Sequence, residues 1–408
     1  MSDPAPLARN LRLYPWLLFA RNLYLWQAVW FLYLEGELGA EQAALLAAIY
    51  DLGTVLLEVP SGYLCDLIGR RVTFVLACLA SCVGCALLGL GHGFWLFAGA
   101  QALQGLSGAF ASGTGSALLY ESLLALDRGE ELTAHEVRAH RYSFSALACS
   151  ALLGGALALV WPRGTYYATA LAAAVSVVLA LALREPPLPS DAPPAAPPLG
   201  QLLAVVGRLR DPALAWLTLF SVVAFVLEDV PYVLLQPYLR ELLSVWGRPE
   251  LTPVVAGGVI AVMMATSALT SAWAPGLRAR LGLGGSLLAT LGLQLLLVLG
   301  MAVSLHVAVV GLLVLRMVPR GLRDPLLSAA VQPRLERGYR ATFLSLMNLL
   351  GRLVFSASLL AVAFQLPEGR ELDHAAIQTV APVYLVACGA AALILAVGWR
   401  AVARPSPT

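Results

Sequence analysis

The sequence predicts an all-α integral membrane protein with about twelve transmembrane helices in two pseudosymmetric six-helix halves. Three observations carry this prediction: an apolar composition, a series of long apolar stretches, and a proline-rich segment near the middle of the chain. Of the 408 residues, 59% are hydrophobic and 12% are charged, and the mean hydropathy is +0.79. Soluble domains are roughly half apolar and a quarter charged. Lipid is the environment that tolerates so much apolar surface.

The apolar stretches have the length of membrane spans. A helix needs about 20 mostly apolar residues to cross a bilayer. The first stretch has no small-residue cleavage site after it, so we expect it to remain as a helix. The predicted helices lie near residues 11–34, 40–64, 72–90, 94–119, 142–161, 166–183, 214–239, 252–275, 284–306, 307–331, 341–365 and 379–399.

A proline-rich segment separates the two sets of stretches. Residues 184–200 read REPPLPSDAPPAAPPLG, a composition that prevents helix formation and favours a semi-rigid extended linker. Residues 201–210 follow as a short amphipathic helix expected at the membrane surface. The predicted organisation is therefore an N-terminal half at 1–183, a linker with its surface helix at 184–210, and a C-terminal half at 211–408.

The arginines predict the orientation. With both termini in the cytoplasm, most loop arginines lie inside, as the positive-inside rule requires. Only Arg163, Arg240, Arg248 and Arg370 then fall outside. A net charge of +2 with dispersed basic residues gives no indication of a nucleic-acid partner. The acidic residues expected outside are Glu35, Glu37, Glu41, Glu368, Glu371 and Asp373.

A short motif lies between the second and third predicted helices. Residues 62–71 read GYLCDLIGRR, which resembles the signature loop G-x-x-x-D-x-x-G-R-[RK] of the major facilitator superfamily. Glycine permits close helix approach and tight turns, and an acid at a helix end can pair with an arginine or a helix terminus. The resemblance implies a latch for the outward-facing state; the alternative is a turn with topogenic charge. The latch residues would be Gly62, Asp66, Gly69, Arg70 and Arg71.

Other family motifs are incomplete. Residues 276–282, GLRARLG, look like a degenerate copy of the signature loop without its acid, as expected for transporter repeats. Residues 101–105, QALQG, lack the arginine of the family pattern R-x-x-Q-G, and residues 150–155, SALLGG, lack the Gly-Pro pair of G-P-x-x-G-G. Both departures argue against a standard drug–proton antiporter.

Ionisable residues at bilayer depth are costly and are functional candidates by default. The resemblance implies that the helices near 11–34, 94–119, 214–239 and 307–331 line a central cavity. Glu228 or Asp229 would then bind a cation or carry a coupled proton, and Arg316 would bind an anion or change the acid's pKa. The alternative is a set of structural ion pairs. Adjacent Glu228 and Asp229 cannot both point one way on a helix.

The complete set of candidate cavity residues combines these charges with aromatic and amide groups, which suit an amphiphilic organic molecule. Arg21, Arg320, Arg323 and Asp324 are further charges within the predicted spans, and Glu121 lies near the cytoplasmic end of the span at 94–119. The candidate substrate or ion residues are Tyr24, Gln27, Asp51, Glu58, Glu228, Asp229, Tyr232, Arg316, Asn348 and Arg352.

The predicted function is secondary active transport by alternating access, coupled to an ion gradient, with protons as the expected ion. Residues 112–123, SGTGSALLYESL, and 340–353, RATFLSLMNLLGRL, resemble bacterial permeases mostly labelled exporters. We therefore expect export of a hydrophobic or amphiphilic molecule across a bacterial inner membrane by a monomer. The alternatives are uptake of an organic anion or metabolite, and a lipid flippase of the same fold.

Other classes of function lack their signatures. The chain contains no lysine, so it has no G-x-x-x-x-G-K-[ST] loop for ATP-driven pumping. No Ser/His or paired metal-ligand constellation lies within the predicted spans, so the chain is not expected to be an enzyme or to hold a metal or other cofactor. Its expected partners are the lipid bilayer and a small-molecule substrate.

Overall fold

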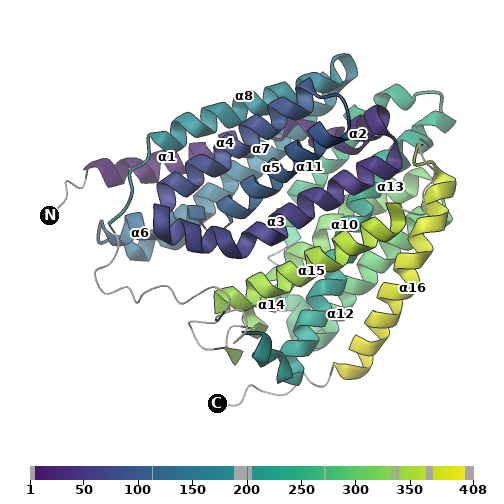
Figure 1. Ribbon diagram of the computed structural model, residues 1–408. Coiled ribbons are helices and arrows are strands. Elements are labelled where there is room, and N and C mark those ends of the chain that lie inside the picture. The colour runs from purple at the N-terminus through teal and green to yellow at the C-terminus, as the bar shows by residue number, and fades with distance from the viewer. Residues whose placement is uncertain are drawn as a thin grey trace. The chain divides into compact units, whose positions relative to one another are not determined.

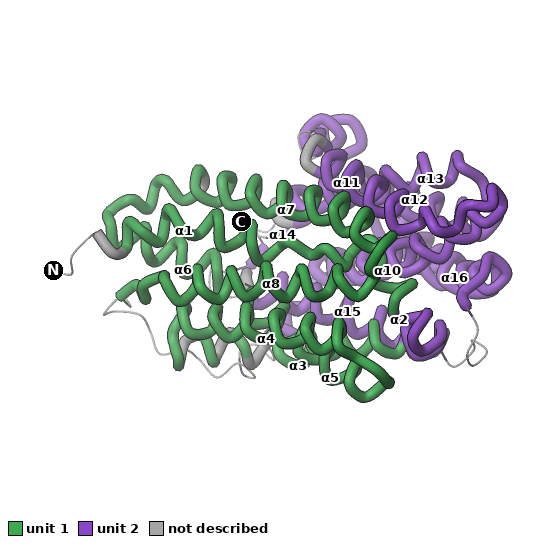
Figure 2. Tube along the Cα trace, turned by 90° about the horizontal axis from the view of Figure 1, so that it is seen from above, with its two compact units in different colours: residues 1–33, 45–198 green, residues 34–44, 199–408 purple. Residues whose placement is uncertain are grey.

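The computed structural model is helical, with no strand among the residues that it describes. These are residues 5–112, 114–187, 200, 205–270, 273–331, 334–335, 340–363 and 371–399; the side chains at 5–6, 59–60, 62–63, 66, 133, 268–269, 328–329 and 340–341 lie outside the description. Two compact units form, unit 1 from Met1–Tyr33 and Leu45–Pro198, and unit 2 from Leu34–Ala44 and Leu199–Thr408 (Figure 2).

Unit 1 is a helical bundle in which α4 packs along both α5 and α8 (Figure 1). Part of its apolar core joins Leu17, Phe74, Cys78, Leu118 and Ala180, all nearly inaccessible to solvent. Its elements are α1 (Ala5–Arg21), η1 (Leu25–Ala28), α3 (Ala40–Ile68), α4 (Arg70–Leu90), α5 (Phe94–Ala111), α6 (Thr114–Leu124), η2 (Gly129–Glu131), α7 (Leu132–Val160) and α8 (Pro162–Leu181). Helix α2 (Trp30–Leu38) crosses the unit boundary, and the first residues of α3, Ala40–Ala44, also belong to unit 2.

Unit 2 is built around α10 (Pro212–Val245), which packs against α11, α12, α15 and α16 (Figure 1). The Asp211 side chain caps this helix by accepting the Ala213 N–H at 2.8 Å, a common start signal. The remaining elements are η3 (Arg208–Arg210), η4 (Pro249–Leu251), α11 (Thr252–Thr270), α12 (Ala274–Val303), α13 (Val307–Leu313), η6 (Val314–Met317), α14 (Val318–Val331), α15 (Arg340–Ala363) and α16 (His374–Gly398).

The long apolar helices confirm the predicted fold class. Within the described residues, nine helices are long and apolar enough to cross a membrane. Three predicted spans are instead interrupted: 11–34 by η1, 94–119 between α5 and α6, and 307–331 by η6. Composition does not change at these breaks, so an apolar count cannot detect them. A total of twelve transmembrane helices therefore stays a prediction.

Glycine marks corresponding turns in the two units. Gly69, between α3 and α4, has a φ of 93°, and Gly282, inside α12, has a φ of 69° with a non-helical ψ of 178°. Residues with a side chain rarely adopt such a positive φ, whereas glycine does so without strain. Each glycine closes one of the two signature-like sequences, so the weak repeat in sequence coincides with a repeated turn.

Segment η1 is held by close contact with α7 and α8. The Gln27 amide donates to the Leu147 carbonyl and to the Ser150 hydroxyl, each at 2.8 Å. The Leu25 N–H donates to the Thr169 hydroxyl at 3.0 Å. A Cβ at Gly154 would lie only 1.9 Å from the Leu25 carbonyl oxygen. Glycine at 154 therefore allows the interrupted segment to lie directly against α7.

We expect Gly154→Ala to lower the free energy of unfolding by about 1–3 kcal/mol, because the new methyl group must push η1 away. Thermal unfolding of the purified chain in detergent checks this. Gly99→Ala is the matched control, since a Cβ there has no neighbour within 4 Å. Equal unfolding temperatures for the two variants would contradict the close approach of η1.

Candidate functional site

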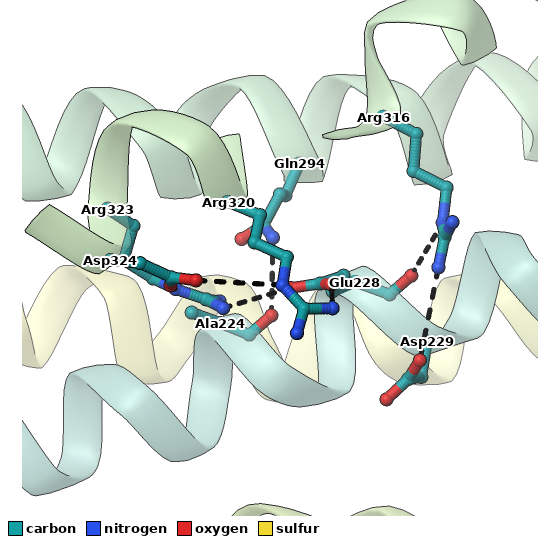
Figure 3. A network of polar contacts seen from close by, with 8 residues as sticks. All are labelled: Ala224, Glu228, Asp229, Gln294, Arg316, Arg320, Arg323 and Asp324. Atoms are coloured by element: carbon teal, nitrogen blue, oxygen red, sulfur yellow. Dashed lines mark hydrogen bonds and ion pairs between the residues drawn. The ribbon is translucent and has the colours of Figure 1, made fainter. Parts of the chain in front are cut away.

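Helix α10 places two acids side by side at the middle of unit 2. Glu228 is buried, with 6% of its side chain exposed, whereas the Asp229 side chain is 27% exposed. The two carboxylates diverge, as helix geometry predicts, and each meets arginines of the interrupted passage at 307–331 (Figure 3).

Arg316 lies in η6 and reaches α10 in three ways. Its Nε donates to the backbone carbonyl of Glu228 at 3.0 Å, and its Nη2 lies 3.9 Å from Asp229 Oδ1. Its guanidinium stands 5.0 Å from the centre of the Tyr232 ring, within range of a cation–π contact. The side chain is only 5% exposed, so these contacts replace most of its water.

Two further arginines bind the Glu228 carboxylate. Arg320 Nη1 lies 3.0 Å from Oε1, and Arg323 Nη2 lies 3.0 Å from Oε2. Asp324 joins from the same helix, at 3.6 Å from Arg320 and 3.1 Å from Arg323. Figure 3 shows Glu228 between the two guanidinium groups. We refer to these residues, with Asp229 and Arg316, as the α10–α14 cluster.

The α10–α14 cluster is balanced in charge but unequal in exposure. Its three arginines and three acids cancel formally. Glu228, Arg316 and Arg323 are almost fully buried, whereas the Arg320 and Asp324 side chains are each 53% exposed. A buried pair is costly to break, and exposed charges can meet a ligand or a proton. The cluster therefore has a buried part, Glu228, Arg316 and Arg323, and a more exposed part, Asp229, Arg320 and Asp324.

Sequence reasoning missed Gln294, on α12. Its amide nitrogen donates to the Ala224 carbonyl at 3.2 Å, one turn before Glu228, while its Oε1 is buried without a hydrogen-bond partner. Arg323 Nη1 is likewise buried without one. A lone amide within the apolar stretch 284–306 was the available signal, because burying an unsatisfied amide is unfavourable.

Within unit 2, the structure brings four of the predicted site residues together. Glu228, Asp229, Tyr232 and Arg316 meet in unit 2, as described above. Arg352, on α15, stands 5.5 Å from the Phe225 ring, and Asn348 is exposed on the same helix. The candidates that belong to unit 1 are Tyr24, Gln27, Asp51 and Glu58.

Unit 1 positions its candidates in different ways. Gln27 holds η1 against α7 and is therefore engaged structurally. The Tyr24 hydroxyl accepts from Arg21 Nη1 at 3.4 Å. Asp51 is buried and Glu58 partly buried on α3, seven residues apart and hence on one helix face.

The predicted latch lies where α3 meets α4. Arg70 Nη2 lies 3.0 Å from Glu121 Oε1 on α6. The backbone N–H groups of Arg70 and Arg71 donate to the two oxygens of Glu185, at 2.5 and 2.8 Å. A distant carboxylate thus caps the first turn of α4, where the helix dipole favours negative charge. Gly62 and the Asp66 side chain fall outside the described residues, and the latch role stays a prediction.

The chemistry of the site is that of ion pairs. Among the described residues, no group of three or more His, Cys, Asp and Glu side chains could hold a metal ion. What the α10–α14 cluster offers is a partly exposed carboxylate beside a buried guanidinium and an aromatic ring.

Comparisons with known proteins agree with the architecture. The chain is similar to the nucleoside transporter NupG, at 13% identity and a TM-score of 0.78 over 96% of this chain and 99% of that one. A bacterial homologue of the iron transporter ferroportin, in an inward-facing state, gives 20% identity and a TM-score of 0.67 over 97% and 98% of the two chains. A bacterial homologue of the human lysosomal transporter Spinster gives 14% identity and a TM-score of 0.67 over 100% of both chains.

These identities are low enough that the solved structures establish the fold alone. A search of curated proteins gives no match. The family model of the Major Facilitator Superfamily matches residues 16–359, a range that includes the signature-like loop and the α10–α14 cluster. The chain therefore belongs to the major facilitator superfamily of membrane transporters.

Proposed function

We propose that this chain is a proton-coupled secondary active transporter that exports a hydrophobic or amphiphilic small molecule by alternating access. The observation that supports it is the α10–α14 cluster, whose charges balance and whose acid Asp229 is partly exposed beside Arg316. The working setting is a bacterial inner membrane, with a monomeric chain and both termini in the cytoplasm. Family membership supports transport in general, and the cluster supports the coupling.

Protonation of Asp229 changes the cluster's formal charge from zero to +1. In a low-dielectric site this change alters which ligand or conformation is favoured, because charge interactions are strong there. The cluster also lies at the interruption η6, and discontinuous helices are where transporters of this kind place substrate and ion sites. A proton at Asp229 can thus bias the equilibrium between two states of the transporter.

The surroundings of the cluster suit a substrate with both apolar and charged parts. Tyr232 presents its ring to Arg316 at 5.0 Å, and Phe225, Phe355 and Arg352 lie together nearby in the same unit. Aromatic faces and a few convergent polar groups are typical of sites for drug-sized organic molecules.

Uptake of an organic anion is the second candidate. Arg320 favours it, because 53% of its side chain is exposed although it belongs to an ion-pair network. An exposed guanidinium binds carboxylates and phosphates in a bidentate manner. The direction of transport then decides between the two functions.

Flux in proteoliposomes tests the proposal. With an imposed pH gradient, wild type should drive ethidium or p-toluenesulfonate across the bilayer, and Asp229→Asn should lose at least about tenfold of this flux while retaining probe counterflow. Glu250→Gln is the control, because Glu250 is an exposed acid 3.8 Å from Arg248. Full gradient-driven flux in Asp229→Asn would exclude Asp229 as the coupling acid, and the sign of flux separates export from uptake.

A further inference from the structure

Two interrupted passages carry an arginine at the break. Arg21 is the last residue of α1, just before η1 (Leu25–Ala28), and Arg316 lies within η6 (Val314–Met317). The two residues occur in different units. Their surroundings differ in one respect that has a chemical consequence: Arg316 has a carboxylate partner, Asp229, whereas none of the described residues supplies one to Arg21.

The contacts of Arg21 are carbonyl and hydroxyl groups. Nη2 donates to the Ser107 carbonyl at 3.1 Å and lies 3.4 Å from the Ser107 hydroxyl, and Nη1 lies 3.4 Å from the Tyr24 hydroxyl. The Phe74 ring centre is 6.0 Å from the guanidinium carbon. Nε is buried without a hydrogen-bond partner. No carboxylate lies within 4 Å of Arg21 in the part of the chain that the structure describes.

Other mostly buried arginines of this chain do have such a partner. Arg70 pairs with Glu121, Arg240 with Glu35, and Arg323 with Glu228. Each pair follows the rule that a desolvated charge needs a counter-charge and further hydrogen bonds. Arg21 differs from these three arginines, and it lies within the predicted span at 11–34, where lone charges are rare and mark ligand pathways.

Local dipoles compensate Arg21 only in part. Its position at the C-terminal end of α1 is favourable for a cation, but the helix dipole amounts to about half an elementary charge. The Ser107 carbonyl contributes another partial charge. Arg21 is also partly exposed as a residue, although its Nε is buried. The charge of Arg21 is therefore only partly compensated, and the residue is partly exposed. Both properties are expected of a cationic site that an anionic ligand completes.

We propose that Arg21, with the hydroxyl groups of Tyr24 and Ser107, binds the acidic group of an organic anion. The guanidinium presents several N–H groups in a plane that matches a carboxylate, sulfonate or phosphate. This inference deepens the proposed function by naming the substrate's charge, and rests on it only for the claim that the bound anion is transported.

Ligand-induced stabilisation tests anion binding without any transport. The full chain is purified in dodecyl maltoside at constant chloride and ionic strength, and its Tm is measured with p-toluenesulfonate or with p-toluenesulfonamide, which has the same ring and no charge. The sulfonate should raise the Tm of wild type by about 3 °C or more, and the sulfonamide should not. Arg21→Gln should lose the shift, Arg21→Lys should keep part of it, and the exposed-site control Arg248→Gln should keep all of it.

The ligand-free proteins give an independent measurement. Because Arg21→Gln removes a charge without a counter-charge, its Tm should equal or exceed that of wild type. A lower Tm for Arg21→Gln together with an unchanged sulfonate shift would overturn the inference and make Arg21 structural. Stabilisation by inorganic phosphate alone would also overturn it, since the site would then not take an organic anion. Loss of pH-driven flux in Asp229→Asn is a separate result, so the two proposals fail separately.

Discussion

Replacing Arg240 with alanine is expected to lower the free energy of unfolding by about 3–5 kcal/mol, because Glu35 would remain buried without its cation. Glu35, on α2, is only 1% exposed at its side chain, and its Oε2 accepts from Arg240 Nη1 at 2.5 Å. Its other oxygen accepts the Leu372 N–H, and Arg240 Nη2 donates to the Leu372 carbonyl at 3.2 Å. Glu371 adds an acid 3.3 Å from Arg240.

We refer to Glu35, Arg240 and Leu372 as the clamp, because their contacts hold a short segment of the chain in unit 2. The chain leaves unit 1 after Tyr33, contributes Leu34–Ala44 to unit 2, and returns to unit 1 at Leu45. Glu35 ties that segment to α10 and to the start of α16 by two separate hydrogen-bonded contacts. Losing the cation would therefore weaken the attachment of Leu34–Ala44 to α10 within unit 2.

Controls for the clamp come from the same chain. Arg248→Ala breaks an exposed Arg–Glu pair at 3.8 Å and should change stability by no more than about 1 kcal/mol. The double variant with Glu35→Gln and Arg240→Gln should recover much of the loss, because it buries no lone charge. Unfolding in detergent, followed by circular dichroism, measures all three. Equal stability of Arg240→Ala and Arg248→Ala would show that the clamp does not hold.

The clamp also illustrates what the sequence could predict. The arginine distribution assigned both Glu35 and Arg240 to outer loops. An acid and a base on the same side of the membrane can form an ion pair. Nothing in the sequence brings together two residues that lie 205 positions apart. The apolar stretches predict helices because their signal is local, whereas the pairing of Glu35 with Arg240 depends on how α2 and α10 pack.

The candidate site shows the same contrast between local signals, which the sequence carries, and long-range packing, which it does not. The cost of charge at bilayer depth, together with the family resemblance, singled out Glu228, Asp229 and Arg316. The short helix η6 brings Arg316 against α10. The contact of Gln294 with the Ala224 carbonyl depends on how α12 packs against α10, which the sequence cannot show. The breaks at η1 and η6 were missed because the apolar composition continues through them.

Adjacent acids on α10 provide the second large effect. Glu228→Gln is expected to lower the free energy of unfolding by about 3 kcal/mol, because it leaves Arg323 buried with less counter-charge. The carboxylate is 3.0 Å from both Arg320 and Arg323, and the Arg323 side chain is 10% exposed. Asp324 remains beside Arg323 at 3.1 Å, which keeps the loss at the lower end of the range for broken buried pairs.

Asp229→Asn is the matched control for this effect. It makes the same chemical change one residue along the helix, but at a side chain that is 27% exposed and 3.9 Å from its arginine. Its stability should change by no more than about 1 kcal/mol, while its gradient-driven flux falls. The double variant with Glu228→Gln and Arg323→Gln should be more stable than the sum of its single changes predicts, with a coupling of about 0.5–3 kcal/mol.

These measurements separate a structural acid from a functional one. If Glu228 is mainly the ion-pair partner of two arginines, its loss lowers the stability of the fold. Transport then falls only because less of the protein is folded. If Asp229 exchanges protons, its loss changes pH-driven flux in a chain that remains folded. The converse pattern, with stable Glu228→Gln and unfolded Asp229→Asn, would reverse the roles. The expected pattern would give two neighbouring carboxylates of the same helix different roles, because one contacts two guanidinium groups and the other is partly exposed.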